Sequence, residues 1–252
     1  MVNGFIGATE DVLRLSEARL FQVTTRLTPV EARRAVYIDF EGRTDKPPVL
    51  LGALYATGDN FDSRQPVLIH YVVDPSFAGL GGDWSVSSMR RYEIRHASLG
   101  QALNEVIRLA RSRDRLIVSW SQFDMQKVME HGLTGMLADE FALRYRDAKA
   151  TAKRWFREHH GDVHLEPGRS GRLHSLENYA KLIGFEIPEK YGVGRTGENL
   201  RVVGQALERH SVWNDLTDRQ QGRWLEVVGH NAYDLLGLRD VTERSAAELS
   251  DG

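Results

Sequence analysis

The segment VLLGALYA at residues 49–56 constrains the fold more than any other part of the chain. It is apolar almost throughout, whereas a strand with one face in water alternates apolar and polar side chains. Because turn-forming residues bound it on both sides, the run is typical of a short strand rather than of a helix. Both faces of such a strand are covered, so we expect a sheet with helices on each side.

Two further runs flank this strand and predict a three-stranded meander. Ala35–Phe40 alternates in polarity, and Pro66–Val73 is apolar and β-branched. A helix with apolar positions around Leu103 follows, and then a short buried strand at Leu116–Trp120. From Gln122 onward the pattern is helical nearly to the end, and this order of elements predicts an α/β fold.

Composition excludes several classes of protein. The 252 residues are 41% apolar and 27% charged with a formal net charge of −2, which describes a globular chain rather than a disordered or uniformly cationic one. No run approaches the roughly 20 apolar residues of a membrane helix, and the N-terminus lacks a signal-peptide profile, so we expect a cytoplasmic protein with no membrane contact. The chain has no cysteine, so any metal must be bound by oxygen or imidazole ligands.

Acidic residues accompany the predicted elements in three places. Alternation along the first strand puts Asp39 and Glu41 on one face, where two ionised carboxylates repel each other unless a divalent cation relieves the repulsion. Asp124 lies where a helix begins after a buried strand, a common place for a site residue in an α/β sheet. His230 and Asp234 are four residues apart and share a helix face. Each feature also has a structural explanation, as an exposed strand end, a helix N-terminus or a buried His–Asp pair.

Taken together, these segments resemble a nuclease family. VYIDFEG (36–42), SWSQFDMQKV (119–128) and GHNAYDLLGLRDV (229–241) look, in that order, like the three motifs of the DEDD nucleases of the ribonuclease H-like superfamily. HSLENYAKLIGFEIP (174–188) resembles the segment that those proteins carry before the third motif. The likeness covers most of the chain, and it is closest to predicted ribonuclease H-like nucleases of uncertain substrate.

The resemblance implies a ribonuclease H-like domain over residues 34–252. The residues before it, 1–33, have a helical pattern in which Thr9 can cap the first turn, so we expect a helical lead-in there. The sheet of the domain would be mixed, with a three-stranded antiparallel meander plus parallel strands, and flanked by helices. Four carboxylates would bind two Mg²⁺ or Mn²⁺ ions, namely Asp39, Glu41, Asp124 and Asp234. Two such ions, about 3.5–4 Å apart, hydrolyse phosphodiesters, and a 3′–5′ exonuclease acting on DNA or RNA is the usual activity of the family.

The general base is the point at which this chain departs from the family. Proofreading members have His five residues, or Tyr four residues, before the last Asp, whereas this chain has His230 four residues before Asp234. An imidazole can accept a proton from water near neutral pH, so His230 is a candidate catalytic residue. The identity of the base stays open.

Residues 142–172 are net basic, and aromatic side chains lie between the cations. Cations that bind phosphates and rings that stack on bases are typical of sites for single-stranded nucleic acid. The candidate nucleic-acid-binding residues are Arg144, Lys149, Lys153, Arg154, Trp155 and Arg157. The alternative is a solvated helix whose aromatic side chains pack in the core.

Other functions fit parts of the sequence. Gly192, Gly194 and Gly197 have the spacing of a dinucleotide-binding loop but follow no strong strand, so a flexible turn explains them better. The second hypothesis that we keep is a catalytically inactive nucleic-acid-binding or complex-forming subunit with a nuclease-like fold. A degenerate subunit of this kind should have lost some of the four carboxylates, and all four are present. DNA and RNA substrates, single-stranded or with a free end, fit the sequence equally, and so does membership of a larger protein complex.

Overall fold

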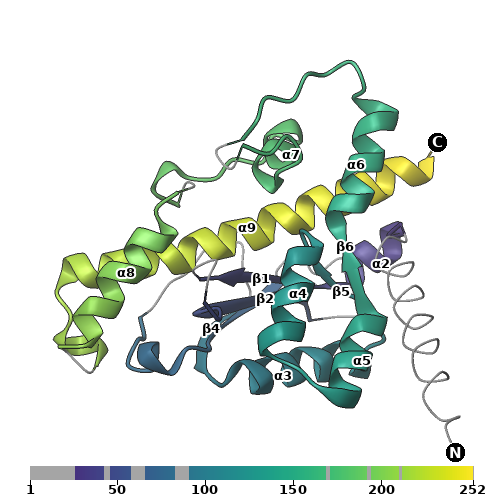
Figure 1. Cartoon of the computed structure of the whole chain (residues 1–252). Coiled ribbons are helices and arrows are strands. Elements are labelled where there is room, and N and C mark those ends of the chain that lie inside the picture. Colours follow the sequence, from purple (N-terminus) through teal and green to yellow (C-terminus); the bar gives the residue numbers. More distant parts are fainter. Residues whose placement is uncertain are drawn as a thin grey trace, which may run out of the picture.

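The computed structural model describes residues 26–42, 46–57, 66–82, 91–168, 171–191, 194–209 and 212–251. Within these ranges the chain is an α/β protein, in which a six-stranded mixed sheet is flanked by helices (Figure 1). The strands are β1 (Val36–Glu41), β2 (Leu50–Ala56), β3 (Pro66–Val72), β4 (Arg91–His96), β5 (Ile117–Ser119) and β6 (Tyr145–Asp147). The α-helices are α2 (Pro29–Arg34), α3 (Leu99–Ser112), α4 (Gln122–His131), α5 (Gly135–Arg144), α6 (Ala148–His159), α7 (Leu176–Leu182), α8 (Thr196–Leu207) and α9 (Asp218–Asp251).

The strand order across the sheet is β4-β3-β2-β1-β5-β6. β1, β2 and β3 are antiparallel neighbours, which confirms the predicted meander, and β5 runs parallel to β1. The sequence analysis missed the two edge strands, β4 and β6, each parallel to its neighbour. β4 (RYEIRH) is charged and has no apolar run, and β6 has three residues and continues directly into α6, where a helix was predicted.

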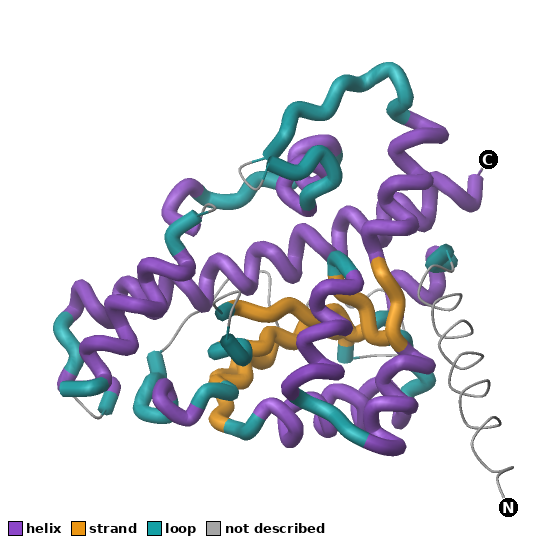
Figure 2. Tube along the Cα trace, in the orientation of Figure 1, coloured by secondary structure: helices purple, strands orange, loops and turns teal. Residues whose placement is uncertain are grey.

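Helices cover both faces of the sheet, as the apolar β2 segment predicted. Alternation along β2 sends Leu50 into the core that lies against α9, and Leu51 into the core that lies against α3. α9 has 34 residues, which make about 50 Å of helix, and it crosses the sheet on the face to which Leu50 points (Figures 1 and 2). Trp224 of α9 is fully buried there, whereas Val106 of α3 packs on the other face.

The predicted N-terminal lead-in is described only from residue 26, and residues 1–25 lie outside the described part. Thr28 and Glu31 form a capping box at the start of α2, which explains why that helix begins at Pro29. α2 packs against α9. Among the helices that the structure describes, not one has both the length and the apolar character needed to cross a membrane.

Candidate metal centre

Three segments far apart in the sequence meet beside the end of β1. β1 and β5 are parallel neighbours, so their carboxyl ends lie at the same edge of the sheet, and α4 begins directly after β5. The middle of α9 lies over β1 and β2 at this edge. Asp39, Glu41, Asp124 and Asp234 are consequently close enough for their charges to act on one another.

His230 lies among these carboxylates. Its Nε2 is 3.8 Å from Oε1 of Glu41 and 3.6 Å from Oδ2 of Asp234. Ligand atoms from these three residues lie within 4.8 Å of one another, so the trio could hold a metal ion. The spacing of four residues does put His230 and Asp234 on one face of α9, as predicted.

A backbone carbonyl fixes the orientation of the His230 ring. Nδ1 of His230 is 2.8 Å from the carbonyl oxygen of Tyr191, which lies in the 3₁₀ turn Glu189–Tyr191. A carbonyl only accepts, so Nδ1 carries a proton and Nε2 is the ring nitrogen that faces the carboxylates. Gly229 allows this contact, because a Cβ there would lie 2.2 Å from the Tyr191 ring.

Ionisation of the carboxyl groups of this cluster is unfavourable where they lie. Burial raises the pKa of Asp39 and Glu41 well above the usual values, and the neighbouring carboxylates raise both further. Burial also raises the pKa of Asp124 to about 6 and raises that of Asp234. Glu41 and Asp124 are 8% and 9% exposed, while Asp39 and Asp234 remain partly open to solvent. A divalent cation would relieve this repulsion.

The sequence analysis missed two side chains that act on the cluster, one on α4 and one on α9. Lys127 is buried beside the cluster, and its charge lowers the pKa of Glu41 and of Asp124. Asn231 is fully buried, and its Nδ2 donates a 2.7 Å hydrogen bond to Oδ2 of Asp39. Each lies three residues from a predicted site carboxylate, Lys127 after Asp124 and Asn231 before Asp234. One helical turn therefore separates the two residues of each pair, and this spacing is the sequence signal from which Lys127 and Asn231 could have been predicted.

A fifth carboxylate, Asp147, lies at the end of β6. Its backbone pairs with that of Ser119 in β5, and its side chain accepts a 2.8 Å hydrogen bond from the backbone N–H of Lys149. Burial raises the pKa of Asp147 to about 6, and the charge of Asp124 raises it too. Asp147 therefore caps α6 at the border of the cluster, where no sequence motif marked it.

The donor set fits a hard divalent cation. Carboxylate oxygens and a single imidazole are ligands that suit Mg²⁺ and Mn²⁺, and no thiolate is present in the chain. Among the described residues, Lys127 lowers the pKa of Glu41 and Asp124, and His230 lowers that of Asp39 and Asp234. Four acidic groups outnumber these two, so a divalent cation would offset the remaining negative charge. Glu41, His230 and Asp234 are close enough to one another that they could hold such an ion.

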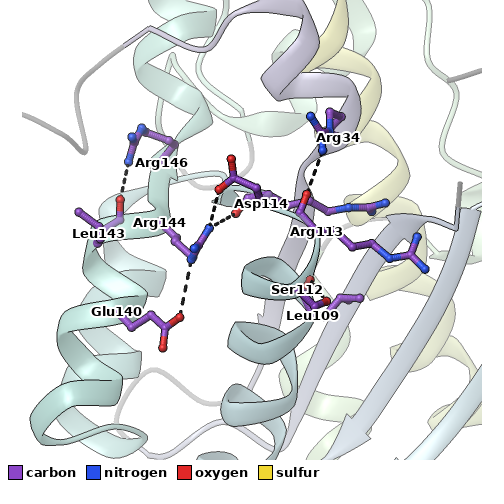
Figure 3. Close-up of polar contacts among 10 residues, drawn as sticks. Arg34, Leu109, Ser112, Arg113, Asp114, Glu140, Leu143, Arg144 and Arg146 are labelled. Atoms are coloured by element: carbon purple, nitrogen blue, oxygen red, sulfur yellow. Dashed lines mark hydrogen bonds and ion pairs between the residues drawn. The ribbon is translucent and has the colours of Figure 1, made fainter. Parts of the chain in front are cut away.

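The predicted nucleic-acid-binding residues differ in exposure and in ion pairing. Trp155 is 1% exposed and donates from Nε1 to Glu248 at 2.6 Å, so the expectation that its ring stacks on a base is wrong. Arg144 reaches Asp114 at 3.3 Å and Glu140 at 3.8 Å (Figure 3). Arg154 is paired with Glu158 at 2.7 Å. The charges of both arginines are therefore already neutralised by neighbouring carboxylates.

The other three cations share one face of α6. Lys149, Lys153 and Arg157 are spaced by four residues. Lys153 and Arg157 are exposed, and neither forms an ion pair with another residue in the described part of the chain. Burial lowers the pKa of His174, and the positive charges of Lys153 and Lys149 lower it further. This basic face begins beside Asp147 and so runs outward from the border of the metal centre.

Comparison with known proteins adds no assignment. No protein-family model matches the chain, and no curated protein matches it. The functional argument therefore rests on the geometry of the site.

Proposed function

We propose that this protein is a metal-dependent nuclease with a ribonuclease H-like fold and a DEDD-type site that hydrolyses phosphodiester bonds of DNA or RNA. One observation carries the proposal: carboxylates from β1, α4 and α9 converge with His230, and ligand atoms of Glu41, His230 and Asp234 lie within 4.8 Å of one another. A mixed sheet with an antiparallel meander and a parallel β5 supports it. The resemblance of the three motifs favours a 3′–5′ exonuclease.

Each side chain has a role that follows from its position. Asp39, Glu41, Asp124 and Asp234 would hold Mg²⁺ or Mn²⁺, which when bound would polarise the phosphodiester and activate water for attack. Nε2 of His230 faces this cluster, and in the neutral ring it would accept a proton from water or serve as a metal ligand. Lys127 contributes a buried positive charge beside the same carboxylates, in the place where the negative charge of a phosphate must be accommodated.

An exposed ring next to the centre replaces Trp155 as the candidate for base stacking. Phe123 precedes Asp124 in α4 and is 46% exposed. The Nζ atom of Lys127 lies 5.2 Å from the centroid of the Phe123 ring. Lys127 therefore links the ring to the carboxylates, and an exposed aromatic face at this distance suits the base of a bound single strand.

Cleavage assays test the proposal directly. Wild-type protein is incubated with 5′-labelled single- and double-stranded DNA and RNA, in Mg²⁺, Mn²⁺ or chelator. We expect metal-dependent shortening from the 3′ end, with loss of all cleavage in chelator and in Asp234→Asn. Asp240→Asn is the matched control on α9, because Asp240 pairs with Arg239 outside the cluster and its variant should retain activity. A circular substrate separates endonuclease from exonuclease action.

Failure of the assay would favour the second hypothesis. Tight binding of nucleic acid without cleavage, in every metal, would indicate an inactive binding or complex-forming subunit. Cleavage that persists in Asp234→Asn would show that the proposed centre is not the active site.

The basic face of α6 is expected to bind the substrate strand. We expect Lys149→Ala, Lys153→Ala and Arg157→Ala together to weaken binding of single-stranded nucleic acid about 10- to 100-fold, because three phosphate contacts are lost. The slope of log K against log salt should fall by about 2, since each contact on a single strand contributes about 0.7. Fluorescence anisotropy at several salt concentrations, in chelator, measures both quantities.

The control for this surface removes three cations that already have partners. Arg111→Ala, Arg154→Ala and Arg201→Ala change the net charge by the same amount, but these side chains bond Glu140, Glu158 and Gln205. Equal weakening by the two triple variants would show that overall charge, rather than the α6 face, determines binding.

A further inference from the structure

A row of three residues crosses the meander on the side that faces α9. Asp39 in β1 is paired with Gly52 in β2, and Gly52 is paired with His70 in β3. Residues on either side of His70 in β3, Leu68 and Val72, belong to an apolar core, whereas His70 is polar and fully buried. A buried imidazole in such a strand requires a polar partner.

The side chain of Asn231 extends from α9 toward the sheet and occupies the space above Gly52. A Cβ on residue 52 would lie 2.0 Å from Oδ1 of Asn231, so only glycine leaves room for the amide. Oδ1 of Asn231 is 2.9 Å from Nε2 of His70, and Nδ2 of Asn231 donates to Oδ2 of Asp39 at 2.7 Å. A hydrogen bond from Asn231 also lowers the pKa of Glu41. The amide thus connects a buried histidine to both carboxylates of the first motif.

In the metal-binding form of the site Asp39 is ionised, and the chemistry of these groups then permits a single arrangement of protons. An ionised carboxylate only accepts hydrogen bonds, so Asn231 turns its NH₂ group toward Asp39 and its oxygen toward His70. That oxygen also only accepts, so Nε2 of His70 must carry the proton. Nδ1 of His70 is buried and has no hydrogen-bond partner among the described residues, which agrees with a neutral ring. Burial lowers the pKa of His70 to about 4, so the ring remains neutral at physiological pH.

We propose that His70 is a positioning residue for the metal centre: its Nε2–H fixes the amide of Asn231, which in turn orients Asp39 and Glu41 for the cation. This inference rests on the proposed function in assuming that these carboxylates bind metal. His70 lies beyond the carboxylates and acts through Asn231. Without the Nε2–H donor, the amide can rotate by half a turn and present its oxygen to Asp39, which repels the carboxylate. The Oδ1 lone pairs would also be left buried without a donor.

A pair of variants separates the hydrogen bond from the packing. His70→Leu replaces the imidazole by an apolar side chain that has no hydrogen-bond donor. In His70→Gln, the Nε2–H₂ group of the glutamine can replace the imidazole N–H as donor to Asn231. Calorimetric titration with Mn²⁺ measures the affinity without reference to activity. We expect about 10-fold weaker binding in His70→Leu, as for other residues that orient metal ligands, and recovery of most of that loss in His70→Gln. Equal losses in both variants, or no loss in either, would overturn the proposal.

A spectroscopic measurement on the wild-type protein tests the same inference without metal. Long-range ¹H–¹⁵N correlation spectra report which ring nitrogen of a histidine is protonated, and the signals missing from His70→Gln identify His70. We expect the neutral Nε2–H tautomer from pH 5.5 to 8, and Nδ1–H or a charged ring would overturn the proposal. If wild-type protein neither binds Mn²⁺ nor cleaves nucleic acid, the proposed function fails, while the tautomer still decides whether His70 holds Asn231.

Discussion

Replacing Asp39 by Asn is expected to abolish metal-dependent cleavage and, in chelator, to make the protein more stable. Loss of a metal-binding carboxylate should lower kcat/KM by at least about 10³-fold. The stability effect has the opposite sign, because burial and the neighbouring carboxylates hold the pKa of Asp39 well above its usual range. Asparagine has the same shape without the charge, and we expect Tm to rise by about 2–4 °C for each 1 kcal/mol of repulsion that is removed.

Thermal unfolding at several pH values checks this prediction. A carboxyl group with a raised pKa in the folded state binds protons more tightly when folded, so the stability gained from protonation is present at low pH and lost as the pH rises through the folded pKa. Because burial raises the pKa of Asp124 to about 6 and raises that of Asp39 well above normal, wild-type protein in chelator should gain stability between pH 8 and pH 6. Asp39→Asn should gain less over the same interval.

Mn²⁺ should reverse the ranking of the two proteins. Binding of the cation to the folded state stabilises wild-type protein by mass action, whereas Asp39→Asn should gain little. A variant that is less stable than wild type in chelator would contradict the electrostatic account of the cluster. An unchanged cleavage rate in the variant would remove Asp39 from the site.

Replacing Gly52 by Ala should damage both the fold and the site. The new Cβ would lie 2.0 Å from Oδ1 of Asn231 and 2.6 Å from Cδ1 of Leu235, and both side chains are buried on α9. Either these side chains shift within the packed core or α9 moves away from the sheet, so we expect the free energy of unfolding to fall by about 1–3 kcal/mol. Displacement of Asn231 should also weaken Mn²⁺ binding by about 10-fold or more.

Gly222→Ala is the matched control, because it introduces the same atoms at a helical position with nothing within 4 Å of the new Cβ. Alanine is favoured over glycine inside a helix by roughly 0.5–1 kcal/mol, so this variant of α9 should be more stable than wild type. Urea unfolding monitored by circular dichroism measures both changes. Equal stability of Gly52→Ala and Gly222→Ala would contradict the close contact between α9 and β2 at Gly52.

Local periodicity accounts for the parts of the site that the sequence predicted. Alternation along β1 put Asp39 and Glu41 on one face, and both lie on the side that α9 covers. The spacing of four residues on α9 brought His230 next to Asp234. These arrangements follow from the geometry of one strand or one helix, which the order of residues fixes without reference to the rest of the chain.

Contacts between distant segments decided what the sequence alone did not. Trp155 occurs in a basic run, yet α7 and the end of α9 bury its ring in a small core. His70, Gly52 and Asn231 carry no motif individually, and they acquire a role only because strand register and helix packing bring them into one row. The sequence by itself determined the α/β order and the local pairs of site residues. The tertiary structure decided which cations stay exposed and which neutral groups hold the carboxylates, because burial and hydrogen bonding depend on neighbours contributed by other elements.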